Sequence, residues 1–149
     1  MKPTSQISRV AFYGRSARPQ TSRIGQQYLR CVAQLPPGWV VTAAFYDYGT
    51  SNRRVPGPSR IDLGGTHITG HGGLDDLLTT VKDQRPRVDK VIVASLDRLG
   101  LDRRNVSTLL RRLQRANVTL HVADMQARQV TALEVWTRVW DQATSEAQP

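Results

Sequence analysis

The chain has 149 residues, a length typical of one domain, and 39% of its residues are hydrophobic. Its formal net charge is +9, and only three of its 21 basic residues are lysines, so arginine dominates. The single cysteine, Cys31, excludes an intrachain disulfide, and the longest apolar stretch, residues 39–46, is too short to cross a bilayer. With no signal-peptide pattern, we expect a cytoplasmic protein, and the arginines favour a phosphate-bearing partner such as nucleic acid over a membrane surface.

The apolar pattern predicts strands and helices in alternation along the chain. The predicted strands are residues 9–13, 39–46, 90–96 and 118–123. The predicted helices are residues 22–35, a stretch from 74 that ends near Pro86, a stretch around 106–113 that ends at Asn117, and a closing helix over 126–143. Residues 47–72 are rich in Gly, Pro, Ser and Arg without a clear period, and we expect a loop that carries function or is mobile.

This alternation predicts an α/β fold with a mainly parallel sheet and right-handed crossovers. In such sheets the functional groups lie beyond the carboxyl ends of the strands. Arg15 follows the first predicted strand, and Asp97 and Arg98 follow the third. If these two strands are neighbours, the three side chains converge on one crevice, and two arginines with one acid suit a phosphodiester.

Four short motifs occur in a fixed order along the chain. They are Tyr13-Gly14-Arg15, Ser22 with Gln26, residues 45–51 (FYDYGTS) and residues 96–100 (LDRLG), and the helix start at residues 72–78 also fits. Together the motifs resemble the catalytic domain of the serine site-specific recombinases, which include resolvases, invertases and large serine integrases. The resemblance covers residues 9–124. It implies a resolvase-like three-layer domain with a four-stranded, mainly parallel sheet flanked by helices, and a C-terminal helix.

In that family a serine hydroxyl attacks a DNA phosphate, which leaves a 5′-phosphoserine link and a free 3′-hydroxyl. Arginines stabilise the pentavalent transition state, and no metal or cofactor is needed. The resemblance assigns site roles to Arg15, Gln26, Asp47, Asp97 and Arg98, with Asp97 as a support for Arg98. The residues expected to contact DNA are Arg15, Arg53, Arg54, Arg98, Arg103 and Arg104.

Three places depart from the family pattern. The family motif Tyr-x-Arg-x-Ser puts the nucleophile at position 17, which is Ala17 here. Ser16 is a candidate replacement, although a shift of one residue along a strand turns a side chain to the other face. Gly70 and His71 stand where the family has an arginine, and Leu101 stands where another is expected. Because such groups act together on the transition state, we predict an impaired site.

A second interpretation is a non-catalytic protein that uses the recombinase fold to dimerise, or to dock on DNA or on an active recombinase and regulate it. An engineered substitution would explain Ala17 but not Leu101. Structural explanations also stay open for Arg15 as a surface residue, for Gln26 as a solvated helix residue and for Asp47 as the start of a turn. The three arginines 111, 112 and 115 form either a solvated face or a track for phosphates.

We expect residues 1–149 to form one domain, with a core over 9–124 and a C-terminal helix over 125–143. Trp136 and Trp140 are spaced i,i+4 on this helix, so they either pack against the domain or form the contact of a homodimer or higher oligomer. We expect no separate DNA-recognition domain, so a partner protein would supply site recognition. A nucleoid-associated location in the cytoplasm follows from this interpretation. The three histidines lack metal-ligand spacing, and Cys31 is expected in the core.

Overall fold

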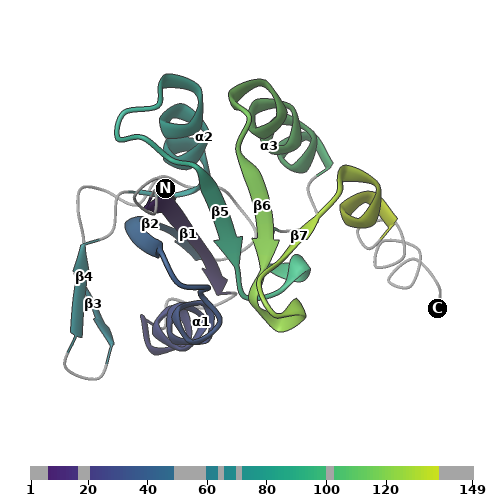
Figure 1. Cartoon of the computed structure of the whole chain (residues 1–149). Coiled ribbons are helices and arrows are strands. Elements are labelled where there is room, and N and C mark those ends of the chain that lie inside the picture. Colours follow the sequence, from purple (N-terminus) through teal and green to yellow (C-terminus); the bar gives the residue numbers. More distant parts are fainter. Residues whose placement is uncertain are drawn as a thin grey trace, which may run out of the picture.

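The computed structural model describes residues 7–16, 21–48, 60–63, 66–69, 72–99 and 103–137. Its main strands are β1 (Ser8–Ser16), β2 (Trp39–Tyr48), β5 (Lys90–Val93), β6 (Thr119–Val122) and β7 (Arg128–Val130). Its helices are α1 (Thr21–Ala33), α2 (Leu74–Asp83) and α3 (Arg103–Ala116). The sheet has the order β2-β1-β5-β6-β7, with α1 on one face and α2 and α3 on the other (Figure 1). The predicted α/β class with helices on both faces of a mainly parallel sheet is confirmed.

Side chains along β1 alternate between two hydrophobic cores, one on each face of the sheet. Ala11 and Tyr13 belong to the core under α2 and α3, whereas Val10 and Phe12 belong to the core under α1. All four side chains are fully buried. Burial on both faces explains why this strand is a continuous apolar run rather than an alternating one.

The strand β1 lies at the centre of the parallel part of the sheet, between β2 and β5. The first and third predicted strands, β1 and β5, are therefore neighbours, as the convergence of Arg15 and Arg98 requires. The carboxyl ends of β1, β2 and β5 lie at one edge of the sheet. After β5 the chain enters a 3-10 helix, η1 (Leu96–Leu99), so the predicted strand over 90–96 is shorter than expected.

The fifth strand, β7, lies inside the stretch predicted as a closing helix, so that prediction is wrong at its start. β7 pairs antiparallel with β6, and the helix begins only at residue 132. Thr131 and Glu134 form a reciprocal cap there: the Glu134 backbone N donates to Thr131 Oγ1 (3.2 Å), and the Thr131 backbone N donates to Glu134 Oε1 (3.4 Å). The cap fixes the helix start after the strand.

A hairpin occupies part of the segment predicted as a loop over residues 47–72. Strands β3 (Arg60–Leu63) and β4 (Thr66–Thr69) pair antiparallel in a sheet of their own, and β3 lies against α1 (Figure 1). The loop prediction is wrong for these eight residues. Within the ranges that the structure describes, none of the helices has the length and apolar character needed to span a membrane.

Candidate active site

Arg15 and Asp47 lie opposite each other at the carboxyl ends of β1 and β2. The Arg15 Nη2 atom is 3.8 Å from Asp47 Oδ2, and both residues are buried. The Tyr13 hydroxyl links them a second time: Arg15 Nε donates to the Tyr13 oxygen (3.2 Å), and the Tyr13 hydroxyl donates to Asp47 Oδ2 (2.7 Å). The three side chains form one hydrogen-bonded chain on the α2 face of the sheet.

The start of α2 supplies a further donor to this chain. The backbone N of Leu74 donates to Asp47 Oδ2 at 2.9 Å, so a helix N-terminus faces the carboxylate. Burial raises the pKa of Asp47, while the bonds from Tyr13 and Leu74 and the charge of Arg15 act to lower it. Burial likewise raises the pKa of Tyr13, so its hydroxyl keeps its proton and stays a donor.

Gln27 of α1 holds the backbone of Arg15. The Arg15 backbone N donates to Gln27 Oε1 (3.0 Å), and Gln27 Nε2 donates to the Arg15 carbonyl oxygen (2.8 Å). The same carbonyl accepts a second bond, from Arg98 Nη1 at 3.2 Å. Arg15 and Arg98 are therefore brought together, as the sequence predicts.

Gln26, the glutamine assigned to the site from the sequence, is exposed, and its neighbour Gln27 is the one that is buried beside Arg15. The helical spacing contains the signal for this. Ile24 and Cys31 are on the inner face of α1 and are fully buried, and Gln27 falls between them at i+3 from Ile24. A glutamine on an otherwise apolar stripe needs a buried partner, which here is the backbone of Arg15.

Ser16 lies on the other side of the sheet from the Arg15 side chain. It pairs in register with Tyr48, which packs against the core under α1, whereas Arg15 contacts Tyr13 on the α2 face. Ser16 is 1% exposed, and its Oγ finds no hydrogen-bond partner among the described residues. The same holds for the Tyr48 hydroxyl, for Asp47 Oδ1 and for Arg98 Nε.

The remaining predicted site residues are placed in part. Asp97 lies in η1 and Arg103 in the first turn of α3, but only their backbones are described, and Arg104 is exposed on α3. The positions that carry the departures from the family pattern, together with two predicted DNA contacts, lie outside the described residues. They are Ala17, Arg53, Arg54, Gly70, His71 and Leu101.

No group of three or more metal-ligating side chains occurs in the part of the chain that the structure describes. His121 instead has structural partners, with Nε2 at 2.7 Å from Thr119 Oγ1 and Nδ1 at 2.8 Å from the Ala127 carbonyl oxygen. Burial lowers the pKa of His121 and raises the pKa of the Cys31 thiol to about 12. The chemistry that this site offers is anion binding by two guanidinium groups, backed by a buried carboxyl and a phenol.

Comparison with known proteins relates this fold to one protein family. The family model for the resolvase N-terminal domain matches residues 10–137. The crystal structure of a resolvase family site-specific recombinase from Streptococcus pneumoniae is similar, with a TM-score of 0.59 and 20% identity over 93% of this chain and 87% of that one. The N-terminal catalytic domain of TP901-1 integrase gives a TM-score of 0.55 and 15% identity over 93% of this chain and 94% of its own.

A search of curated protein sequences gave no significant match. The two solved structures show the fold, and the family model covers most of the chain, from near the start of β1 to the helix after β7. The chain therefore belongs to the resolvase N-terminal domain family, which is the catalytic-domain family of the serine recombinases.

Proposed function

We propose that this domain binds DNA through phosphate contacts at Arg15 and Arg98 and is impaired in strand cleavage. The observation that supports DNA binding is the convergence of the two arginines. Arg98 Nη1 donates to the Arg15 carbonyl oxygen, and the Arg15 side chain is paired with Asp47. Guanidinium groups held at fixed positions fit the oxygens of a phosphodiester and favour the negative charge of its transition state.

The absence of a hydroxyl at position 17 supports the proposed impairment of strand cleavage. In the family the serine at that position forms the bond to phosphorus and the 3′-oxygen leaves, and an alanine has no atom for the first step. Ser16 is a poor substitute, because it is buried and lies on the face of the sheet that Arg15 does not share. Gly70, His71 and Leu101, in place of arginines, remove further charge stabilisation.

A second candidate function is a non-catalytic protein that dimerises or docks on DNA or on an active recombinase. The burial of Ser16 favours it, and so does Leu133, which is 75% exposed on the helix after β7. Trp136 is half-buried and packs against the core under α2 and α3, so its contacts are within the domain. Under either function we propose a homodimer or higher oligomer in the cytoplasm, associated with the nucleoid, with a partner that supplies site recognition.

The test is a gel assay with labelled duplex fragments of the source genome, run before and after denaturation with detergent. We expect a retarded band that disappears in detergent and weakens steeply as salt rises, because the contacts are ionic and not covalent. The variant R98Q should weaken this band. R30Q is the control, since it removes one charge from an exposed arginine that Asp124 already pairs.

Each other outcome is informative. A band that survives detergent and maps to Ser16 would overturn the proposed impairment and move the nucleophile by one position. A total lack of retardation, at low salt as well, would overturn DNA binding and favour docking on a protein partner.

A further inference from the structure

The outer face of α3 is rich in arginine. The helix carries five arginines and no acid over Arg103–Ala116. Its inner side is fixed by Val106, Leu109 and Leu113, which are buried in the core shared with α2. Since the apolar stripe sets the rotation of the helix, the arginines on the opposite side must face outward.

Three of these arginines lie in one row along the helix. Arg104, Arg111 and Arg115 are separated by seven and four residues, which are about two turns and one turn, and all three are exposed. Arg112 lies next to the row and is half-buried. At a rise of about 1.5 Å per residue the row is about 16 Å long. We name the set of Arg104, Arg111, Arg112, Arg115 and the neighbouring Lys82 of α2 the α3 basic face.

Two hollows flank the row and give it a shape. One has a volume of about 250 Å³ and is lined by Lys82, Arg112, Arg115 and Ala116, between α2 and α3. The other has a volume of about 500 Å³ and is lined by Arg104, Ser107, Thr108, Arg111 and Trp136. The row is thus a ridge with a cationic hollow on one side and an aromatic wall on the other.

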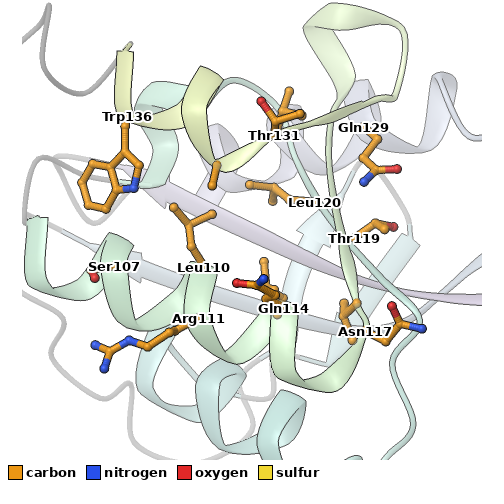
Figure 2. Close-up of a pocket in the computed structure, with 14 residues that line it drawn as sticks. Ser107, Leu110, Arg111, Gln114, Asn117, Thr119, Leu120, Gln129, Thr131 and Trp136 are labelled. Carbon is orange, nitrogen blue, oxygen red and sulfur yellow. The ribbon is translucent and has the colours of Figure 1, made fainter.

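The aromatic wall also borders a third hollow of about 510 Å³, which lies between α3, β6 and the helix after β7. Figure 2 shows this hollow, with Trp136 facing Ser107 and Leu110 across it and Arg111 extending from the side of α3 away from β6. Arg111 therefore reaches the outer surface and not the interior.

Four of the five cations of the α3 basic face, Lys82 and the arginines 111, 112 and 115, form no ion pair within the described part of the chain. The ion pairs there use Arg15, Arg30, Arg87 and Arg128. Like charges in a row repel one another when no anion is bound, and a bound polyanion relieves this repulsion.

The face also lies apart from the Arg15 site over most of its length. α3 begins after η1, at the carboxyl edge of the sheet, and it ends just before β6 begins, at the amino edge. Arg104 is therefore near the site edge, while Arg112 and Arg115 are near the opposite edge. A phosphate held by Arg15 does not occupy the far end of the row.

We propose that the α3 basic face binds the phosphate backbone of duplex DNA, as a second contact beyond the Arg15 site. The proposal rests on the proposed function, in which the domain acts on DNA. The row presents three arginines over about 16 Å, which is enough to contact about three successive phosphates of one strand. Contacts of this type carry no sequence information and add affinity and orientation.

The test compares two double variants that remove the same charge. R112Q/R115Q removes two unpaired arginines of the face. R30Q/R128Q removes two exposed arginines whose charges Asp124 and Glu134 already neutralise. The Kd for a labelled 30-base-pair duplex of arbitrary sequence, about 100 Å long, is measured by fluorescence anisotropy over a range of NaCl concentrations. A third variant, R112K/R115K, keeps the charge, and circular dichroism confirms that each variant is folded.

We expect R112Q/R115Q to weaken binding about tenfold at low salt and to reduce the slope of log K against log salt by about 1.8, which corresponds to two lost phosphate contacts. R30Q/R128Q should change the slope much less, and R112K/R115K should keep most of it. If the wild type binds DNA but R112Q/R115Q and R30Q/R128Q give equal slopes, the proposed DNA contact of the α3 basic face is wrong, while the proposed function stands. A wild type that binds no duplex would overturn the proposed function as well.

Polyglutamate serves as the competing polyanion in the same assay. We expect it to displace the duplex only at much higher charge concentration, since it lacks the regular phosphate spacing. Displacement at equal charge concentration would overturn the assignment to DNA and indicate an acidic protein segment as the occupant.

Discussion

Gly73 leaves no room for a side chain beside Asp47. A Cβ at position 73 would lie 2.9 Å from Cγ of Asp47 and closer still to its Oδ1. The backbone of Gly73 has φ −102° and ψ −159°, which other residues adopt, so glycine is needed here for space and not for its dihedral angles. The close approach lets the start of α2 reach the carboxylate through Leu74.

The first prediction concerns this contact. G73A should lower the free energy of unfolding by about 1–3 kcal/mol, because the added methyl group pushes Asp47 away from the Leu74 N–H. Urea denaturation measures the loss. The double variant D47A/G73A should be less destabilised than the sum of D47A and G73A, since the collision is then absent. Strict additivity would contradict the contact.

The second prediction concerns Gln27. Q27A should lower the free energy of unfolding by about 2 kcal/mol, because the buried N–H of Arg15 loses its acceptor and its carbonyl loses one of two donors. The melting temperature should fall by roughly 5 °C. Q26A is the matched control, and since Gln26 is exposed its change should stay within about 0.5 kcal/mol. Similar losses in the two variants would refute the assignment of Gln27.

The third prediction is a pH dependence. Burial raises the pKa of Asp47 above its ordinary value of 3.8, so the folded chain binds a proton at higher pH than the unfolded chain. Acidification through the raised pKa therefore stabilises the fold through this group, and the gain is complete below about pH 3.8. The stability of the wild type minus that of D47N should rise as pH falls from 7 towards 4.

Urea denaturation at several pH values measures this difference. D83N is the control, because it removes one carboxylate from an exposed position at the end of α2. A difference between wild type and D47N that is constant over this pH range would show that the pKa of Asp47 is not raised.

The fourth prediction concerns the proposed oligomer. Leu133 is 75% exposed, and L133D should shift sedimentation from a dimer towards a monomer, because a charge is costly in an apolar interface. L29D is the control, since Leu29 is 51% exposed on α1 at the opposite face of the sheet. A wild type that sediments as a monomer, or equal behaviour of the two variants, would rule out this contact.

The sequence predicts the buried parts of this fold better than its edges. The strands β1, β2, β5 and β6 can be predicted from their apolar runs, because the strands of a parallel sheet covered by helices bury mostly apolar side chains. β7 has a single buried residue, Val130, between two exposed ones and a threonine cap. Such a short edge strand shows no periodic pattern of its own. The helical spacing of Leu133 and Trp136 therefore led to a predicted helix that began too early and included β7.

The site follows the same rule. The meeting of Arg15 and Arg98 is predicted from the sequence, because each follows a recognisable strand and parallel strands bring their carboxyl ends together, whereas Asp47 is assigned by the resemblance alone. Gln27 was missed because its role depends on the rotation of α1, which counting residues from a motif does not give. Ala17 and Leu101 lie outside the described residues, so the impairment that they imply stays a prediction.

Adjacent residues of β1 point to opposite faces of the sheet, and this limits which residues can act beside Arg15. The sheet separates two groups of side chains, with Arg15, Tyr13 and Asp47 on the α2 face and Ser16 on the α1 face. Under the proposed function, the Ser16 hydroxyl therefore does not replace a nucleophile at position 17, because it lies on the opposite face of the sheet from the Arg15 side chain. If Arg15 holds a phosphate as proposed, attack on it requires a hydroxyl on the same face of the sheet, and the residues next to Arg15 in β1 point to the other face.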